Sequence, residues 1–301
     1  MLQGRVCLVT GATRGIGAAM VEAFARMGAT VVATGRSAER GQDLMSGICQ
    51  RTGNEDVHFL CADLASMAEV RGLARAFTNR WGHLHVLVAN AGTVFPTRRT
   101  TVDGYEEVFA VNHLAPFLLT GLLLPVLRNS VPSRIIVTSS YEHRRGRMHW
   151  DNLQGERFYF SQQAYAQSKL ANLLFVYELA RRLQGSGVTV NAVNPGLVHT
   201  NICMDSGWLI GTVKRMMDRF SGLSPEEGAD TGVWLASSPD VEGVSGRYFQ
   251  RRHAVRSARS SYDVAAQQRL WRISEELTGL STKSGAWLAV EQELGSHGDS
   301  G

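Results

Sequence analysis

The sequence lacks the cysteine and histidine patterns of metal-binding and disulfide-bonded proteins. Its four cysteines stand singly among 301 residues, with no C-x-x-C pair: Cys7, Cys49, Cys61 and Cys203. Such spacing provides neither a metal site nor a disulfide framework, and we expect buried free thiols. The histidines show no H-E-x-x-H or comparable ligand spacing. The sequence therefore predicts no bound metal.

The sequence also shows no long hydrophobic run and no pattern of a signal peptide. No apolar run approaches the length of a membrane span, so the sequence predicts no transmembrane helix. The first expected strand begins soon after Met1, which leaves no room for a signal peptide. We therefore expect a cytoplasmic protein. No repeat or linker divides the chain, so we expect one domain over residues 1–280 and a flexible tail over 281–301.

Excess charge of either sign is small. Lysine and arginine number 31 against 27 acidic residues, a formal net charge of +4. Two basic stretches, within 144–147 and 251–259, do not alternate with aromatic residues and match no nucleic-acid motif. We interpret both as solvated surface and expect no nucleic-acid partner.

Apolar, β-branched runs alternate with segments of helical period over most of the chain. The expected strands cover residues 5–10, 30–34, 57–61, 86–89, 134–139, 188–193 and 247–250. The expected helices cover 16–27, 38–52, 67–81, 103–128, 162–184 and 262–277. This alternation predicts right-handed βαβ units and a doubly wound, mostly parallel, seven-stranded sheet with helices on both faces. Ligands bind such sheets beyond the carboxyl ends of the strands.

A glycine-rich turn follows the first expected strand. Residues 10–17 read Thr-Gly-Ala-Thr-Arg-Gly-Ile-Gly and open a helix. The first glycine allows a tight turn, the second lets the backbone approach a pyrophosphate, and the third lets helix and strand pack closely. The helix N-terminus then presents unpaired N–H groups to the phosphates. We expect dinucleotide contacts from Gly11, Thr13, Arg14, Gly15, Ile16 and Gly17.

The residue after the second strand usually sets the choice between NAD(H) and NADP(H). A carboxylate there binds the ribose 2′-hydroxyl, whereas an arginine accommodates a 2′-phosphate. This sequence has Arg36 and no acid at that place, and Arg14 adds a second guanidinium from the glycine turn. Either arginine alone could be an ordinary surface residue. Both together favour NADP(H).

A tyrosine and a lysine stand four residues apart in a helical segment. Tyr165 and Lys169 therefore share one helix face. An unperturbed phenol titrates near 10, and a fixed positive charge nearby stabilises the phenolate. The pair can thus exchange a proton with a carbonyl or alcohol oxygen. Taken alone, the same spacing also occurs on ordinary exposed helix faces.

Together these features make the sequence resemble the short-chain dehydrogenase/reductase family over nearly its whole length. Five further landmarks occur in the family's order: Ala62-Asp63-Leu64, Asn90-Ala91-Gly92, Val111-Asn112-His113, Ser139-Ser140 and Asn194-Pro195-Gly196. The resemblance implies a Rossmann-type fold and hydride exchange with nicotinamide. Loss of any catalytic residue would have favoured a silent NADP(H)-binding sensor or scaffold, and an epimerase on the same fold stays possible as an alternative.

The resemblance also implies roles for individual residues. Tyr165 corresponds to the general acid/base, and Ser140, which we prefer to Ser139, to the hydroxyl that holds the substrate oxygen. Lys169 corresponds to the residue that lowers the tyrosine pKa and binds the nicotinamide ribose, and Asn112 to the anchor of a relay water. The other implied cofactor contacts are Asp63, Leu64, Asn90, Ala91, Gly92, Pro195, Gly196, Val198 and Thr200.

One departure from the commonest pattern indicates a branch of the family. Ser140 precedes Tyr165 by 165 − 140 = 25 positions, about twice the usual gap. The extra stretch, 141–160, and the motifs around Asn112 and Lys169 resemble the retinol dehydrogenase-like branch. Members often carry an N-terminal membrane anchor, for which the segment before the first strand is too short. A retinoid and another lipophilic carbonyl are therefore both open as substrates.

An apolar segment follows Thr200 and supports a bulky apolar substrate. Its large side chains recur loosely at helical period: Trp208, Leu209, Ile210, Val213, Met216, Met217 and Phe220. We interpret residues 200–224 as a substrate lid, the alternative being a helix that packs its apolar stripe on the core. We thus expect an NADP(H)-dependent oxidoreductase acting mainly as a reductase. A homodimer and a homotetramer both stay open.

Overall fold

The computed structural model describes residues 2–196 and 223–280. Its centre is an eight-stranded sheet in the order β3-β2-β1-β4-β5-β6-β7-β8. The strands are β1 (Val6–Val9), β2 (Thr30–Gly35), β3 (Val57–Cys61), β4 (Val86–Ala89), β5 (Ser133–Thr138), β6 (Val188–Asn194), β7 (Tyr248–Gln250) and β8 (His253–Ala254). The first seven are parallel, and β8 returns antiparallel to β7.

The predicted fold class is confirmed, and the predicted strand number is one short. The central strands are apolar and buried along their length because helices cover both faces. The missed strand, β8, has two exposed residues and therefore carries no apolar or alternating run. The chain reverses its direction of progress between β1 and β4, which places a crevice for ligands at the carboxyl ends of these strands.

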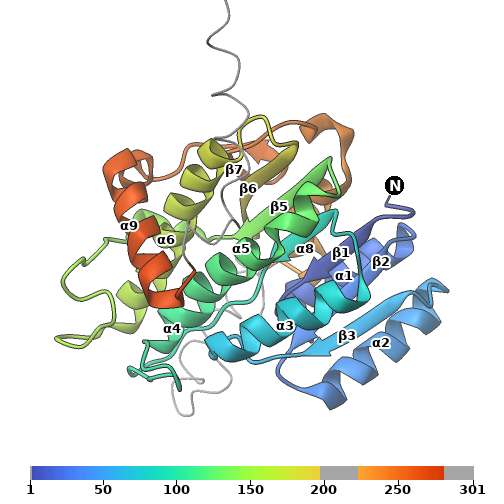
Figure 1. Cartoon of the computed structure of the whole chain (residues 1–301), viewed down its shortest axis with the longest axis horizontal. Helices are drawn as coiled ribbons and strands as arrows, with labels where there is room; N and C mark the ends of the chain where they lie inside the picture. Colours follow the sequence, from blue (N-terminus) through green and yellow to red (C-terminus); the bar gives the residue numbers. More distant parts are fainter. Residues whose placement is uncertain (1, 197–222, 281–301) are drawn as a thin grey trace, which may run out of the picture.

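Helices form a layer on each face of the sheet (Figure 1). One layer contains α1 (Gly15–Arg26), α2 (Ala38–Thr52) and α8 (Pro225–Ser237). The other contains α3 (Met67–Arg80), α5 (Ala115–Arg128), α6 (Ser161–Arg182) and α9 (Val264–Thr278). In Figure 1 α9, drawn in red, lies beside α6 at one end of the molecule, and α2 lies at the other end. Two apolar cores thus enclose the sheet.

Helix ends differ from the predicted ones where local capping decides them. The helix expected from residue 103 begins at Glu107, because the Glu106 carboxylate caps it as α4 (Glu107–Phe109). It continues through a π-helical turn, η1 (Ala110–Leu114), into α5. Helix α8 was not predicted, although Ser224 and Glu227 form a capping box that marks its start. The expected lid, apart from residues 223 and 224, and the expected tail lie outside the described residues.

The prediction that no apolar stretch reaches membrane-span length was wrong. The continuous helical segment Glu107–Arg128 has 22 residues, and its most apolar window has a mean hydropathy of 1.7. However, 78% of that window is buried inside the protein. Core helices enclosed between a sheet and other helices have the same composition. In the described part of the chain this segment belongs to the core layer formed with α3 and α6.

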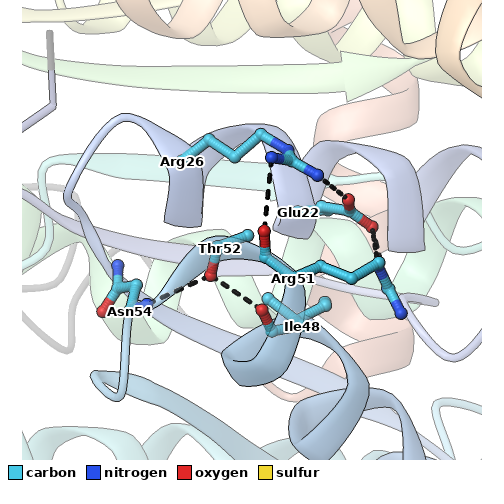
Figure 2. A network of polar contacts seen from close by, with 6 residues as sticks. All are labelled: Glu22, Arg26, Ile48, Arg51, Thr52 and Asn54. Carbon is cyan, nitrogen blue, oxygen red and sulfur yellow. Dashed lines mark hydrogen bonds and ion pairs between the residues drawn. The ribbon is translucent and has the colours of Figure 1, made fainter.

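A polar network joins α1 to α2 beside the first two strands (Figure 2). The Glu22 carboxylate accepts from Arg26 at 2.7 Å and from Arg51 at 2.8 Å, and these charges lower the pKa of Glu22. Asn54 donates to the Ala25 and Ala29 carbonyls, both at 2.9 Å. Because the arginines are about half exposed, solvent screens these pairs and they contribute little to stability. Of the two pairs, Glu22–Arg51 joins α1 to α2, whereas Glu22–Arg26 lies within α1.

Candidate active site

The glycine-rich turn is built into the end of the sheet. Gly11 and Gly15 have positive φ values of 64° and 59°, which favour glycine. A Cβ on Gly17 would lie 2.5 Å from the Gly11 carbonyl oxygen, so helix α1 and the turn are in direct backbone contact. The Asn90 amide donates to the Thr10 carbonyl at 3.0 Å and to the Gly11 carbonyl at 3.3 Å. Asn90, predicted to contact cofactor, therefore also braces the turn against β4.

The N-terminus of α1 fits a pyrophosphate group. Arg14 is its N-cap residue and makes no side-chain cap hydrogen bond, and no acidic residue stands in the first turn. The first N–H groups of a helix need an acceptor, and among residues 2–196 and 223–280 no capping side chain supplies one here. A phosphate at this end would be held by those N–H groups and by the helix dipole. Ile16, at the start of the helix, is buried in the core below.

The two arginines predicted to select NADP(H) stand on segments that contact each other. A Cβ on Gly35, at the end of β2, would lie 2.6 Å from the Thr13 methyl group, so the residues before Arg36 and Arg14 are packed together. Both arginine side chains are exposed. Burial raises the pKa of Glu107, and the charges of Arg99 and Arg36 oppose that shift. Arg36, just after the carboxyl end of β2, is therefore close enough to Glu107 for the two charges to interact.

The segments after β3 and β6 line the same edge of the sheet. Asp63 caps its own turn by accepting from the Ala65 N–H at 3.0 Å, and Leu64 is buried in the core. Gly196 has a φ of 85°, and its N–H donates to the Asn194 side chain at 3.1 Å. Gly196 follows Pro195, and both belong to the Asn194-Pro195-Gly196 motif at the end of β6. Two further predicted contacts, Val198 and Thr200, lie outside the described residues.

The Tyr165 and Lys169 pair stands on α6, as predicted from its spacing. The Lys169 ammonium lies 5.5 Å from the centre of the Tyr165 ring. It donates to the Thr138 carbonyl at the end of β5, with an Nζ–O distance of 3.2 Å. A Cβ on Gly92, after β4, would lie 3.4 Å from Nζ and 3.5 Å from Asn112 Oδ1. The structure thus brings Gly92, Asn112, Tyr165 and Lys169 together.

Lys169 is buried, and its burial has an electrostatic cost. The residue is 2% exposed, and desolvation lowers its pKa to about 8. In the described part of the chain it forms no ion pair with a carboxylate, and a backbone carbonyl is its polar partner. A buried ammonium in this position is stabilised poorly by the protein alone. Such groups are common where a reaction uses the charge.

Ser139 and Ser140 are distinguished by their environments. Ser139 is 1% exposed and donates to the Lys169 carbonyl at 2.9 Å, which ties β5 to α6. Ser140 is only partly buried, and its hydroxyl oxygen accepts a longer bond, 3.3 Å, from the Glu142 N–H. Of the two hydroxyls, Ser140 is therefore the more exposed and the more weakly bonded, and its role stays a prediction.

Asn112 stands in the π-helical turn η1. Its Oδ1 accepts from the Thr93 N–H at 2.7 Å, and its Nδ2 donates to the Thr93 carbonyl at 3.0 Å and to the Ser168 hydroxyl at 2.9 Å. These bonds join the loop after β4 to the α6 turn that carries Tyr165. π-helical turns occur frequently at functional sites. The side chain itself is engaged in positioning the loop.

His143 contacts the site from the segment after Ser140, and the sequence alone assigned it no role. It is fully buried, and its Nε2 accepts from the Ala258 N–H at 3.0 Å. Nδ1 therefore carries the proton and donates to the Ser140 carbonyl at 2.5 Å. Burial lowers the pKa of His143, which keeps this neutral form. No local sequence signal reveals the contact, because the acceptor and donor are far apart along the chain.

The buried Lys169 charge makes the unfolding free energy of the cofactor-free protein pH-dependent. Between the folded pKa of about 8 and the ordinary value of 10.5, the unfolded lysine keeps a proton that the folded one has released. Stability should therefore rise by about 3 kcal/mol across this window, and the full burial cost applies below it. Lys169→Met should lack the rise and be more stable near neutral pH by about 1–3 kcal/mol.

Denaturant unfolding of both proteins near neutral pH and near pH 10, about the upper end of that window, measures this difference. Comparing the two proteins cancels the titration of the other groups. Parallel pH profiles for wild type and variant would contradict the assignment of a buried charge to Lys169.

Comparison with known proteins shows which family the sequence matches. A family model described as short chain dehydrogenase matches residues 5–207. Mouse polyprenol dehydrogenase is 43% identical over 92% of this chain and 84% of its own length. Human retinol dehydrogenase 11 is 41% identical over 93% of this chain and 87% of its own length.

Solved structures agree with the fold. A putative uncharacterized protein from Mycobacterium paratuberculosis is 31% identical, with a TM-score of 0.75, over 92% of this chain and 94% of that one. Pseudomonas aeruginosa RhlG, described as an NADP active-site complex, is 28% identical, with a TM-score of 0.66, over 82% of this chain and 94% of that one.

Proposed function

The chain belongs to the short-chain dehydrogenase family, in its retinol dehydrogenase-like branch, and we propose that it is an NADP(H)-dependent reductase of a bulky, apolar carbonyl compound. That it is an oxidoreductase of this family follows from the comparisons. The observation that carries the catalytic part of the proposal is the buried Lys169 ammonium, 5.5 Å from the Tyr165 ring and beside Gly92 at the carboxyl ends of β4 and β5.

In the proposed reaction each residue of the site has a separate role. When bound, the nicotinamide supplies the hydride that reduces the carbonyl carbon. The Ser140 hydroxyl donates a hydrogen bond to the carbonyl oxygen, and the Tyr165 phenol delivers the proton that the resulting alkoxide needs. The Lys169 charge stabilises the phenolate that remains on Tyr165. In the opposite direction the same phenolate removes the proton of an alcohol.

The proposed substrate class rests on the relatives and on the expected lid. Polyprenol dehydrogenase and retinol dehydrogenase are named for long or bulky apolar alcohols. The apolar segment after Thr200 suits such a substrate. The two arginines favour binding of NADP(H) over NAD(H), and because cells keep this cofactor mostly reduced, we expect the reaction to run toward reduction.

The experiment that tests this proposal follows NADPH consumption by the purified protein. The carbonyl panel runs from small aldehydes to retinal, steroids and polycyclic aromatic ketones. We expect turnover of bulky apolar members above that of small aldehydes. Tight NADPH binding without turnover of any member would instead support a sensor, and interconversion of stereoisomers without net cofactor use would support an epimerase.

Cofactor choice has a separate test in Arg36. Arg36→Ala should weaken NADPH binding about 10-fold or more and leave NADH binding nearly unchanged, because a charge-assisted bond to the 2′-phosphate contributes roughly 1.5–3 kcal/mol. Arg40→Ala, an exposed arginine on α2, is the matched control and should change neither. Fluorescence titration with both cofactors measures the ratio. Equal losses for NADPH and NADH would refute 2′-phosphate recognition by Arg36.

A further inference from the structure

A buried histidine ties the serine of the proposed site to a distant segment of the chain. His143 lies in the short 3₁₀ helix η2 (Tyr141–Arg144), which begins directly after Ser140. Its Nδ1–H donates to the Ser140 carbonyl at 2.5 Å, and its Nε2 accepts from the Ala258 N–H at 3.0 Å. Ala258 belongs to the segment 255–262, which follows β8. The proposed proton transfer uses the Ser140 hydroxyl and gives no task to this connection.

Hydrogen bonds hold the backbone of Ser140 on both sides. The Ser140 carbonyl accepts from the His143 N–H at 3.2 Å as well as from Nδ1 of the same residue. On the amino side, the Ser139 N–H donates to the Val193 carbonyl of β6 at 2.8 Å and continues the sheet. Ser140 itself is extended, with φ −155° and ψ 159°. Since the backbone conformation decides which side-chain rotamers are allowed, the His143 contact helps to set where the Ser140 hydroxyl lies.

A single protonation state of His143 satisfies both partners. The Ser140 carbonyl only accepts and the Ala258 N–H only donates, so Nδ1 carries a proton and Nε2 carries none. An imidazolium ion would direct a second N–H group at the Ala258 N–H. Burial lowers the pKa of His143, the bond to the Ser140 carbonyl opposes this shift, and the charge of Arg144 adds to it. The Tyr248 ring packs edge-on against the imidazole, with 5.0 Å between the centroids.

The Ala258 end of the connection is anchored on α6. Ser261 Oγ donates to the Ala258 carbonyl at 2.6 Å, so it accepts from Ser257 Oγ, which lies 2.7 Å away. Ser257 Oγ in turn accepts from the Tyr177 hydroxyl of α6 at 2.6 Å. The three side chains of this network are buried. Because α6 also carries Tyr165, one helix supports both hydroxyl groups of the proposed site.

We propose that His143 is a positioning residue for Ser140, holding its backbone against the segment around Ala258 so that the serine hydroxyl stays in place beyond β5. The bond to the Ser140 carbonyl does the positioning, and the Ala258 bond keeps the imidazole in the required tautomer and orientation. The inference rests on the proposed function, in which this hydroxyl binds the carbonyl oxygen of the substrate. His143 acts through Ser140 and takes no part in the proton transfer.

The tautomer of His143 can be measured without any turnover. The sequence has nine histidines, and protein labelled with ¹⁵N in the histidine rings gives spectra that correlate ring nitrogens with ring protons. The signals missing from His143→Gln belong to His143. We expect a protonated Nδ1 and an unprotonated Nε2 at neutral pH. A protonated Nε2 would exclude the bond from the Ala258 N–H and overturn the proposal.

Two substitutions separate the hydrogen bonds of His143. In His143→Asn the amide nitrogen can replace Nδ1 and donate to the Ser140 carbonyl, whereas in His143→Gln the amide oxygen can replace Nε2 and accept from Ala258. We expect kcat to fall roughly 10- to 100-fold in His143→Gln and less than about fivefold in His143→Asn, with little change in the KM for NADPH. His83→Asn, at an exposed histidine before β4, is the control. A merely structural role predicts equal losses, which would overturn the proposal.

Amide hydrogen exchange follows the Ser140 hydroxyl in the same variants, whether or not the protein is active. The Glu142 N–H donates to Ser140 Oγ at 3.3 Å, so its exchange rate reports whether the hydroxyl stays in place. We expect this exchange to be at least about fivefold faster in His143→Gln and close to the wild-type rate in His143→Asn. A wild-type rate at Glu142 in His143→Gln would overturn the proposal.

A double substitution tests whether His143 acts through Ser140. Ser140→Ala removes the hydroxyl, so adding His143→Gln to it should lower the remaining kcat by less than about twofold. A further loss as large as in the wild-type background would mean that His143 acts elsewhere, and would overturn the proposal. If the wild-type protein reduces no carbonyl, the proposed function fails, and the His143 tautomer and the Glu142 exchange still decide whether His143 positions Ser140.

Discussion

Replacing Tyr165 with phenylalanine should abolish nearly all carbonyl reduction, with kcat falling roughly 10²- to 10⁴-fold. The substitution removes the phenolic hydroxyl and keeps the ring, which lies 5.5 Å from the Lys169 ammonium on the same helix face. The fold and the NADPH affinity should change little, because the packing of the ring is unaltered. Steady-state rates and a fluorescence titration of NADPH separate the two effects.

Tyr141→Phe is the matched control for this variant. Tyr141 follows Ser140 directly in the chain, and 57% of its surface is exposed. Its hydroxyl has no part in the proposed proton transfer, so its loss should leave kcat within about twofold of the wild type. A Tyr165→Phe protein that retains more than about a tenth of the wild-type kcat would show that another group delivers the proton.

The second large effect concerns Gly17 at the start of α1. Gly17→Ala places a methyl group 2.5 Å from the Gly11 carbonyl oxygen, 2.7 Å from Asn90 Nδ2 and 2.9 Å from the Ala12 Cα. All three atoms belong to the turn or its brace, so the turn must shift. We expect the unfolding free energy to fall by about 1–3 kcal/mol, as for other overpacked sites. NADPH affinity should fall at least about tenfold, because the N–H groups that hold the phosphates move with the turn.

Gly72→Ala shows what the same change does where space is available. Gly72 lies within α3, and a Cβ there would meet no atom within 4 Å. Alanine has the higher helix propensity, so this variant should gain about 0.5–1 kcal/mol. Denaturant unfolding of both variants gives the contrast. A Gly17→Ala protein as stable as Gly72→Ala would mean that helix α1 and the turn are not in the tight contact described.

Features set by neighbouring residues could be predicted from sequence. The pairing of Tyr165 with Lys169 follows from the helical period, and the parallel sheet follows from buried apolar runs separated by helices. The position of the glycine turn could be predicted because its positive φ angles favour glycine. Capping shifts the helix ends by a few residues, as at Glu106, where a buried carboxylate binds the first N–H groups.

Features that depend on contacts between distant segments could not be predicted. His113 and Ser274 are separated by 161 positions, and His143 and Ala258 by 115. No periodicity or motif links such residues, because their proximity arises only when the segments after β8 pack on α6 and its neighbours. The burial of Lys169 is similar, since sequence shows a lysine on a helix face but not the loop and strand that enclose it. The π-helical turn at Asn112 also leaves no local signal.

The most direct test of the central claim follows the hydride itself. NADPH carrying deuterium at nicotinamide C4, on each face in turn, is incubated with the protein and an apolar aldehyde or ketone. The account predicts that one deuterium appears on the carbonyl carbon of the alcohol for each NADPH oxidised, from one face only, and that Tyr165→Phe slows this transfer strongly. NADPH oxidation without deuterium in the alcohol, or equal transfer by the Tyr165→Phe protein, would contradict the assignment of this site to hydride exchange.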